Sequence, residues 1–215
     1  MRTLEQLIDL DDPCLPRLHA SATAGKHLSR FLDPSAQRGA ILTWLQVSTR
    51  SALGSVAYET GGILVDDGWL RVLGSGHVLF ARNVRDWNQG RASGYLLVAD
   101  DAIGGFFALN TGSLGDDIGI IYYWAPDTLA WESLNMGYGD FLDWTFTDGM
   151  AQFYEGLRWQ GWRADVATLG PDQCFNFYPF LWTKQGSVQD STRGIVPIGE
   201  RWLFNIGLAE QLRGG

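Results

Sequence analysis

The chain has 215 residues, of which 46% are hydrophobic and 19% charged, and its formal net charge is −8. This composition is typical of one globular domain and excludes a disordered chain. The acidic balance argues against binding to nucleic acid, because such proteins neutralise phosphates with Lys and Arg, and it favours a basic protein partner.

Cys14 and Cys174 are the two cysteines of the chain, and two cysteines do not make the disulfide framework of a small secreted domain. We therefore expect buried, reduced thiols. No apolar run approaches the roughly 20 residues of a membrane-spanning helix, and the N-terminus lacks the pattern of a signal peptide. These features predict a cytoplasmic protein without membrane contact.

The first fifty residues are predicted to be helical. Thr3 and Gln6 have the spacing of a capping box, which indicates a short helix from Leu4. Asp-Pro pairs at 12–13 and 33–34 favour two further helix starts, because Asp caps a helix and Pro suits its first position.

A helix over 51–59, which ends at a pair of glycines, is predicted next. Two short strands follow at 63–65 and 69–73. Asp-Asp-Gly at 66–68 joins them and is typical of a tight hairpin turn. Residues 74–90 are predicted to form a polar loop.

Three short apolar runs, rich in aromatic and β-branched residues, lie at 95–99, 106–109 and 118–124. Gly, Asp, Asn and Pro separate them, which predicts an antiparallel meander. A helix is predicted to begin at Tyr138, with Asp140 as its cap.

After a break, helical spacing continues to Leu157. Residues 175–182 are predicted to form a strand, in which Pro179 favours a sheet edge or a bulge because proline has no N–H to donate. A short strand at 195–198 and a helix at 200–212 complete the predicted elements.

These elements predict one domain, 1–215, of the α+β class, with an antiparallel or mixed sheet meander. Its parts are a helical N-terminal segment (1–50), a core with the meander (51–146) and a C-terminal extension (147–215) that ends in a helix. The pattern leaves open whether the last seventy residues complete the sheet or form a separate layer.

Two pairs of adjacent carboxylates, Asp100-Asp101 and Asp116-Asp117, are the strongest candidates for chemistry. Such pairs could bind a hard cation, or act as acid and base on either side of a sugar bond. Asp is also typical of turns, where it accepts hydrogen bonds from the nearby backbone. The turn interpretation is favoured, because neither pair has a calcium-loop pattern or a nearby His.

The other titratable residues predict no catalytic, metal or cofactor site. His19, His27 and His77 lack metal-ligand spacing, and neither cysteine joins them. The glycine-rich stretch 74–77 could hold an anion on its backbone N–H groups, but it lacks the Lys-Ser/Thr of a phosphate loop.

A surface of aromatic and arginine side chains is the third candidate, because Trp, Tyr and Arg are enriched at binding hot spots. One region has too little periodicity to place all its rings in the core; it contains Trp159, Trp162, Tyr178 and Trp182, with Arg158 and Arg163. The favoured alternative is that these rings pack against the sheet.

Four motifs occur in a fixed order at 59–62 (ETGG), 98–101 (VADD), 121–124 (IYYW) and 138–144 (YGDFLDW). This order resembles the superfamily of yeast cell-wall regulators and bacterial immunity proteins known as SMI1/KNR4-like, or SUKH. The resemblance covers about 51–144. It implies an α+β fold with helices mainly on one side of the sheet, and a non-enzymatic binding role that often neutralises a toxin.

A closer resemblance, over most of the chain, is to an uncharacterised bacterial family, domain of unknown function 2625. The stretches that carry it are 46–51, 59–73, 157–159 and 177–184. This resemblance implies an identity without a function.

We therefore expect a non-enzymatic binding protein of the immunity or adaptor type, steered by its acidic surface to a basic, toxin-like partner. The residues expected to contact the partner are Asp100, Asp101, Asp116, Asp117, Tyr123, Trp124, Trp159, Trp162 and Trp182. One alternative is a carbohydrate-binding or carbohydrate-active protein with stacked aromatics and paired carboxylates. The other is a structural protein that self-associates as a homodimer.

Overall fold

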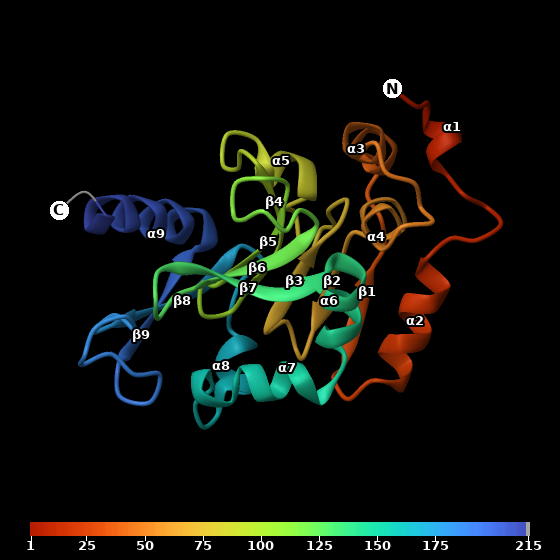
Figure 1. Ribbon diagram of the computed structural model, residues 1–215. Helices are drawn as coiled ribbons and strands as arrows, with labels where there is room; N and C mark the ends of the chain where they lie inside the picture. The colour runs from red at the N-terminus through yellow and green to blue at the C-terminus, as the bar shows by residue number, and fades with distance from the viewer. Residues whose placement is uncertain (214–215) are drawn as a thin grey trace.

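The computed structural model describes residues 1–213 (Figure 1). The first elements are α1 (Leu4–Leu7), α2 (Leu15–Ala24), β1 (Ser29–Leu32), α3 (Arg38–Leu45), α4 (Ala52–Glu59), β2 (Gly62–Val65), β3 (Leu70–Leu73) and α5 (Val84–Asn88). Next come β4 (Tyr95–Asp101), β5 (Phe106–Asn110), β6 (Ile120–Ala125), β7 (Ala130–Gly137), α6 (Tyr138–Thr145) and α7 (Asp148–Phe153). The last are the short 3₁₀ helix η1 (Glu155–Leu157), α8 (Trp162–Val166), β8 (Gln173–Tyr178), β9 (Thr192–Pro197) and α9 (Ile198–Arg213).

Strands β1 to β7 form one antiparallel sheet, in which neighbours in space are also neighbours in sequence. This meander confirms the predicted α+β class. The turn between β2 and β3 has Asp66 at φ 51° and Asp67 at φ 60°, the left-handed geometry that suits a tight hairpin. It places Val65 opposite Leu70, so the predicted hairpin is confirmed.

Strands β1 and β7 and the short helix α5 are not predicted from the sequence pattern. Both strands lie at the edges of the sheet, where part of each strand meets solvent, so neither sequence has a continuous apolar run. In β1 only Leu32 is buried. Helix α5 lies in the segment predicted to be a polar loop, and Asn83 caps it by accepting from the N–H of Asp86.

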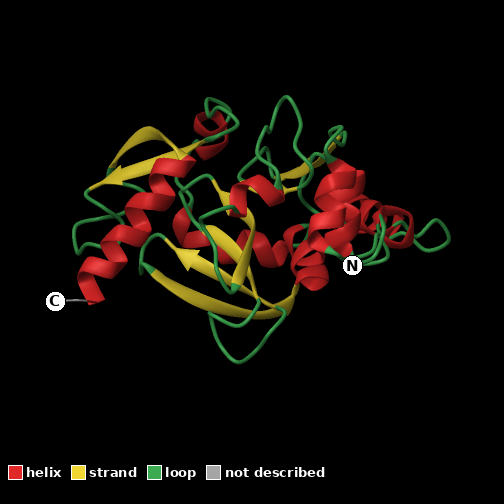
Figure 2. Ribbon diagram, turned by 90° about the horizontal axis from the view of Figure 1, so that it is seen from above, coloured by secondary structure: helices red, strands yellow, loops and turns green. Residues whose placement is uncertain are grey.

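Both faces of the sheet are buried. Because successive side chains on a strand point to opposite sides, neighbouring residues enter different cores. Phe107 and Tyr123 belong to one core, together with side chains of α2, α6 and α7. Phe106 and Trp124 belong to the other, together with side chains of α3, α5 and α9. Helices therefore cover both faces (Figure 2), and the expectation that they pack mainly on one side is not met.

Strands β8 and β9 form a separate two-stranded antiparallel sheet, so this part of the C-terminal extension does not complete the meander. β8 ends at Tyr178, before the predicted end, because Pro179 follows and cannot donate a ladder hydrogen bond. The backbone N–H of Phe175 donates to the carbonyl of Ala102 at 2.7 Å and joins this layer to the end of β4. The layer, with α9, lies at the opposite end of the molecule from α1 to α4 (Figure 1).

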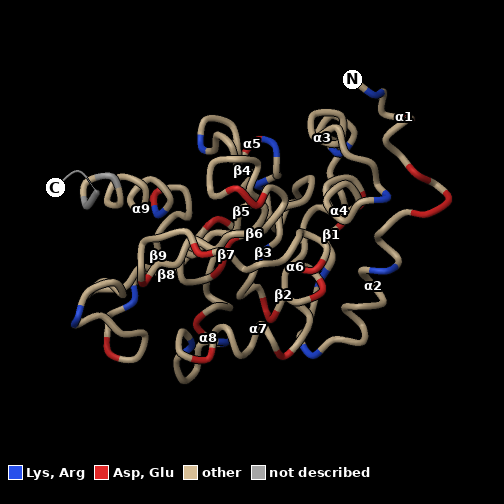
Figure 3. The backbone as a smooth tube through the Cα atoms, in the orientation of Figure 1, with Lys and Arg blue, Asp and Glu red and all other residues tan. Residues whose placement is uncertain are grey.

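Acidic and basic residues are interspersed along the chain (Figure 3). An acidic run, Asp9, Asp11 and Asp12, lies between α1 and α2. No described helix combines the length and the apolar character needed to cross a membrane.

Candidate functional site

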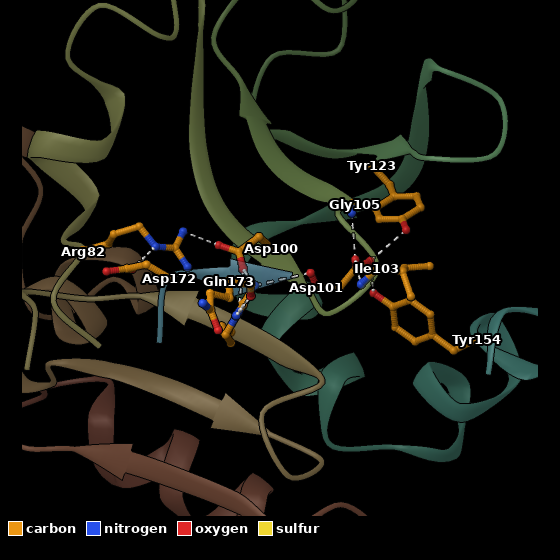
Figure 4. A network of polar contacts seen from close by, with 10 residues as sticks. Arg82, Asp100, Asp101, Ile103, Gly105, Tyr123, Tyr154, Asp172 and Gln173 are labelled. Carbon is orange, nitrogen blue, oxygen red and sulfur yellow. Dashed lines mark hydrogen bonds and ion pairs between the residues drawn. The ribbon is translucent and has the colours of Figure 1, made fainter. Parts of the chain in front are cut away.

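β4 ends in two aspartates, Asp100 and Asp101, whose side chains are completely buried, with 0% of their surface exposed. Because neighbours on a strand point to opposite sides, the two carboxyls enter different polar surroundings (Figure 4). A buried carboxylate is costly unless it is paired or hydrogen-bonded. The partners of each aspartate therefore determine what it can do.

The Asp100 carboxylate lies between two arginines. Arg71 donates from Nε to Oδ1 at 2.7 Å, and Arg82 donates from Nη1 to Oδ2 at 2.5 Å. Arg82 also donates to Oδ1 of Asp172 at 2.7 Å, and Arg71 donates to the carbonyl of Gln173 at 2.6 Å, so β3 and β4 are tied to the start of β8. Burial alone would raise the pKa of Asp100, but the two guanidinium groups outweigh it and hold that pKa below its ordinary value.

Asp101 accepts four hydrogen bonds from uncharged donors. Its Oδ1 accepts from the backbone N–H groups of Ile103 at 3.1 Å and Gly105 at 2.7 Å. Its Oδ2 accepts from the hydroxyls of Tyr123 at 2.8 Å and Tyr154 at 2.9 Å. Burial raises the pKa of Asp101, because it penalises the charged form more than these hydrogen bonds favour it.

The buried polar centre, as we call Asp100, Asp101 and their partners, joins structural elements. It connects the β4–β5 turn to β6 and to Tyr154, the residue after α7, on one face of the sheet, and it connects β3 to β8 on the other. Tyr123 and Trp124 are also buried. The expectation that these four residues contact a partner is corrected, because a side chain without exposed surface cannot form such a contact.

Trp159 and Trp162 also lie in the interior. Their rings pack around Trp69, with centroids 5.9 and 4.9 Å from it. The Arg158 guanidinium lies 4.2 Å from the Trp162 ring centroid and pairs with Asp66 at 2.7 Å. The interpretation that these two rings pack in the core is confirmed, so Trp159 and Trp162 are no longer candidates for contact with a partner.

Asp116 and Asp117 lie in the exposed loop between β5 and β6. The Tyr122 hydroxyl donates to Oδ1 of Asp117 at 2.7 Å, and this hydrogen bond lowers the pKa of Asp117. Tyr122 and Tyr123 are successive residues of β6 and point to opposite faces. Asp101 and Asp117, one aspartate of each pair, therefore bind tyrosines on opposite faces of the sheet, and the two pairs do not form one acid–base site.

Trp182 belongs to a group of four partly exposed rings, Tyr178, Phe180, Trp182 and Phe204, which we call the C-terminal aromatic cluster. Phe180 is central: its ring centroid lies 6.2 Å from Tyr178, 5.6 Å from Trp182 and 5.3 Å from Phe204. Tyr178 is 70% exposed and Phe204 is 43% exposed. The sequence pattern indicates Tyr178 and Trp182 as surface candidates. It misses Phe204, because the helical pattern there shows an inward face and does not show what covers the outer one.

The remaining candidates, the glycine-rich stretch 74–77 and the cysteines, show no free ligand-binding group. In the glycine-rich stretch 74–77, Ser75 Oγ donates to the carbonyl of Thr60 at 2.8 Å and accepts from the N–H of Ser35 at 2.9 Å. Cys174 is buried, and burial raises the pKa of its thiol to about 12. Among the residues described by the structure, no three His, Cys, Asp or Glu side chains come together as metal ligands.

Comparison with known proteins identifies relatives across nearly the whole chain. The family model described as protein of unknown function DUF2625 matches residues 4–201. The chain is 40% identical to the uncharacterized protein YbfG of Escherichia coli K12 over 217 residues, which cover 98% of each. It is 42% identical over 190 residues to an uncharacterized protein of Haemophilus influenzae, covering 84% of this chain and 83% of the relative. Neither name states an activity, so function has to be argued from the molecule.

Proposed function

We propose that this chain, which belongs to the DUF2625 family, is a non-enzymatic binding protein that neutralises or scaffolds a protein partner by contact. The contrast between two regions carries the proposal. Asp100 and Asp101 are sealed in the buried polar centre and cannot reach a substrate, whereas the rings of the C-terminal aromatic cluster meet solvent. A catalytic carboxylate must reach its substrate, but a binding surface needs only to be covered by a partner.

The C-terminal aromatic cluster supplies the kind of side chain that anchors protein interfaces. Tyr and Trp bury a large area at a low cost in conformational entropy and are enriched at hot spots. Leu203, the residue before Phe204 on α9, is also exposed. A contiguous exposed apolar patch of this kind is typical of an interaction site.

The partner in this proposal is a basic protein of the cytoplasm. The net charge of −8 attracts cationic surfaces, and the exposed Asp116 and Asp117 loop adds to that field. The free cysteines suit a reducing compartment. The immunity or adaptor role rests on the resemblance to the SMI1/KNR4-like superfamily, which is an analogy at the level of the fold.

The two alternatives differ in what supports them. A carbohydrate-active protein would use two carboxyls at a cleft, and Asp100 and Asp101 are buried away from any such position. Self-association uses the same exposed rings as the main proposal, because the cluster could be covered by the cluster of a second copy. A homodimer is therefore the alternative that the experiment has to separate.

The test compares the tagged protein with a variant that lacks two anchors, Tyr178→Ala with Phe204→Ala. The wild type should recover one basic protein in near-equal amount from a lysate of the source cell, and recovery should fall as salt rises. The double variant should bind that partner at least about tenfold more weakly, because exposed aromatic hot spots contribute about 2 kcal/mol or more each. Leu10→Ala, which removes an exposed apolar side chain at the other end of the molecule, should bind normally.

Full retention of the partner by the double variant would refute this surface. Size-exclusion chromatography with light scattering distinguishes a homodimer from a monomer that binds a different protein. A dimer in the wild type that becomes a monomer in the double variant would support self-association and contradict the proposal of a different partner.

A further inference from the structure

Arg201, in the first turn of α9, is a buried arginine that has no carboxylate partner among the residues described by the structure. It is 4% exposed, the same as Arg71, whose charge is paired with Asp100. Its Nη1 donates to Oδ1 of Asn176 at 2.7 Å, and its Nε has no hydrogen-bond partner among the described residues. Burial lowers the pKa of Arg201, because the cation has lost water without gaining a contacting anion.

This side chain lines a cavity of about 270 Å³ between the β8–β9 hairpin and α9. The volume is near the lower end of the range for small-molecule sites, roughly 300–1,000 Å³. Two members of the C-terminal aromatic cluster, Phe180 and Phe204, form apolar walls together with Val196. Asn176 accepts from Arg201 through Oδ1, so its Nδ2 can donate to a ligand. The cavity thus combines a buried cation, a second donor and aromatic walls.

We propose that this cavity is a binding site for a carboxylate that carries an apolar, preferably aromatic, body. The carboxylate would pair with the Arg201 guanidinium, whose planar donors match the two oxygens of such an anion. The body would pack against Phe180 and Phe204. Two sources share this chemistry: a free carboxylic acid, and the C-terminal carboxylate of a peptide or protein.

The exposed Glu200 side chain also lines the cavity and restricts the ligand to a single negative charge. A phosphate monoester, with a charge of about −1.5 to −2 at pH 7, would meet stronger repulsion from Glu200 than a carboxylate does. This favours a carboxylate over a phosphate. The rest of the ligand is expected to be neutral or cationic.

The inference deepens the proposed function, because the cavity opens within the C-terminal aromatic cluster, but its test needs no protein partner. Binding of phenylacetate and of its neutral analogue phenylacetamide to the full-length protein is measured by calorimetry and ligand-observed NMR. Phenylacetate should bind at least about tenfold more tightly, which corresponds to about 1.4 kcal/mol. N-acetylglycyl-phenylalanine and its C-terminal amide form the second pair. Tighter binding of the peptide acid would identify a chain terminus as the source, and preference for phenylacetate would identify a free acid.

Variants assign the effect to the cavity. Arg201→Gln should remove the difference between acid and amide, and Phe204→Ala should weaken both. Glu200→Gln, at an exposed position, should tighten phenylacetate about twofold to threefold without changing phenylacetamide, because a screened charge pair contributes only tenths of a kcal/mol. Circular dichroism and urea unfolding establish which variants fold. If Arg201→Gln does not fold, the result with Glu200→Gln still tests the proposal.

Equal affinity for acid and amide would overturn the proposal, as would the lack of saturable binding of both acids up to about 10 mM. A protein that binds phenylacetate but captures no partner would keep the cavity and contradict the proposed function. A protein that captures a partner through Tyr178 but binds neither acid would keep the function and contradict the cavity.

Discussion

Replacing Asp100 with Asn is the sharpest test of the buried polar centre. The substitution preserves the shape of the side chain but removes its charge. Arg71 and Arg82 then remain buried, and among the described carboxylates Asp172 alone still contacts Arg82. In the wild type each arginine contacts the Asp100 carboxylate at 2.7 Å or less, so the variant loses the charge-assisted contacts of both arginines.

The expected loss is large for one substitution. Removing one member of a buried ion pair costs about 3–5 kcal/mol, because the other charge stays buried without compensation. Most domains have a total free energy of unfolding of about 5–15 kcal/mol. The matched control is Asp12→Asn: Asp12 pairs with Arg50 at 3.0 Å, but both side chains are exposed. Exposed pairs contribute about 0–1 kcal/mol.

Urea unfolding followed by tryptophan fluorescence measures both variants. Asp100→Asn should lower the midpoint with little change in slope, whereas Asp12→Asn should leave it nearly unchanged. The folded-state pKa of Asp100 is depressed, so its contribution should be fully present above the unfolded pKa of about 3.9 and be lost as pH falls below that value. A loss below about 1 kcal/mol in Asp100→Asn, matching the control, would refute the claim that this ion pair holds the fold together.

Three predictions concern other parts of the fold. The folded-state pKa of Asp101 is raised, so the free energy of unfolding should fall as pH rises from about 3.9 through that raised pKa. Urea unfolding of Asp101→Asn should lack this fall. The same pH dependence in the wild type and the variant would contradict the prediction. Cys174 should react with a thiol reagent such as DTNB only after unfolding, whereas the half-buried Cys14 should react first; rapid reaction of both thiols in the native protein would be inconsistent with the burial of Cys174. Gly207→Ala should raise the free energy of unfolding by about 0.5–1 kcal/mol, because Gly207 lies inside α9 with open space around its Cα; a fall would indicate that α9 is not helical there.

How far the sequence predicts this fold depends on where each strand lies in the sheet. Strands β4, β5 and β6 are buried on both faces and appear as continuous apolar runs, so their prediction succeeds. Strands β1 and β7 lie at the edges, where polar residues alternate irregularly with apolar ones. Their assignment needs knowledge of the neighbouring strand, which no short window of sequence contains.

The candidate site shows the same limit. Asp100 and Asp101 attract notice in the sequence as an acidic pair, but their chemistry is decided by partners elsewhere in the chain. Arg71 lies directly opposite Asp100 in the pairing of β3 with β4, and that register follows a long connection whose geometry the sequence does not reveal. Without the register, a buried ion pair and an exposed acidic turn have the same local sequence.

Charge compensation is what separates the structural centre of this protein from its proposed binding site. The buried Arg71 and Arg82 both contact Asp100, and Arg82 also contacts Asp172, so two carboxylates balance the two cations within the fold. Arg201 is as deeply buried as Arg71 but contacts a neutral amide. Because an uncompensated buried charge opposes folding, an anion that enters the Arg201 cavity would stabilise the native state as well as bind to it. Phenylacetate should therefore raise the midpoint of urea unfolding more in the wild type than in Arg201→Gln, whereas phenylacetamide should raise it equally in both.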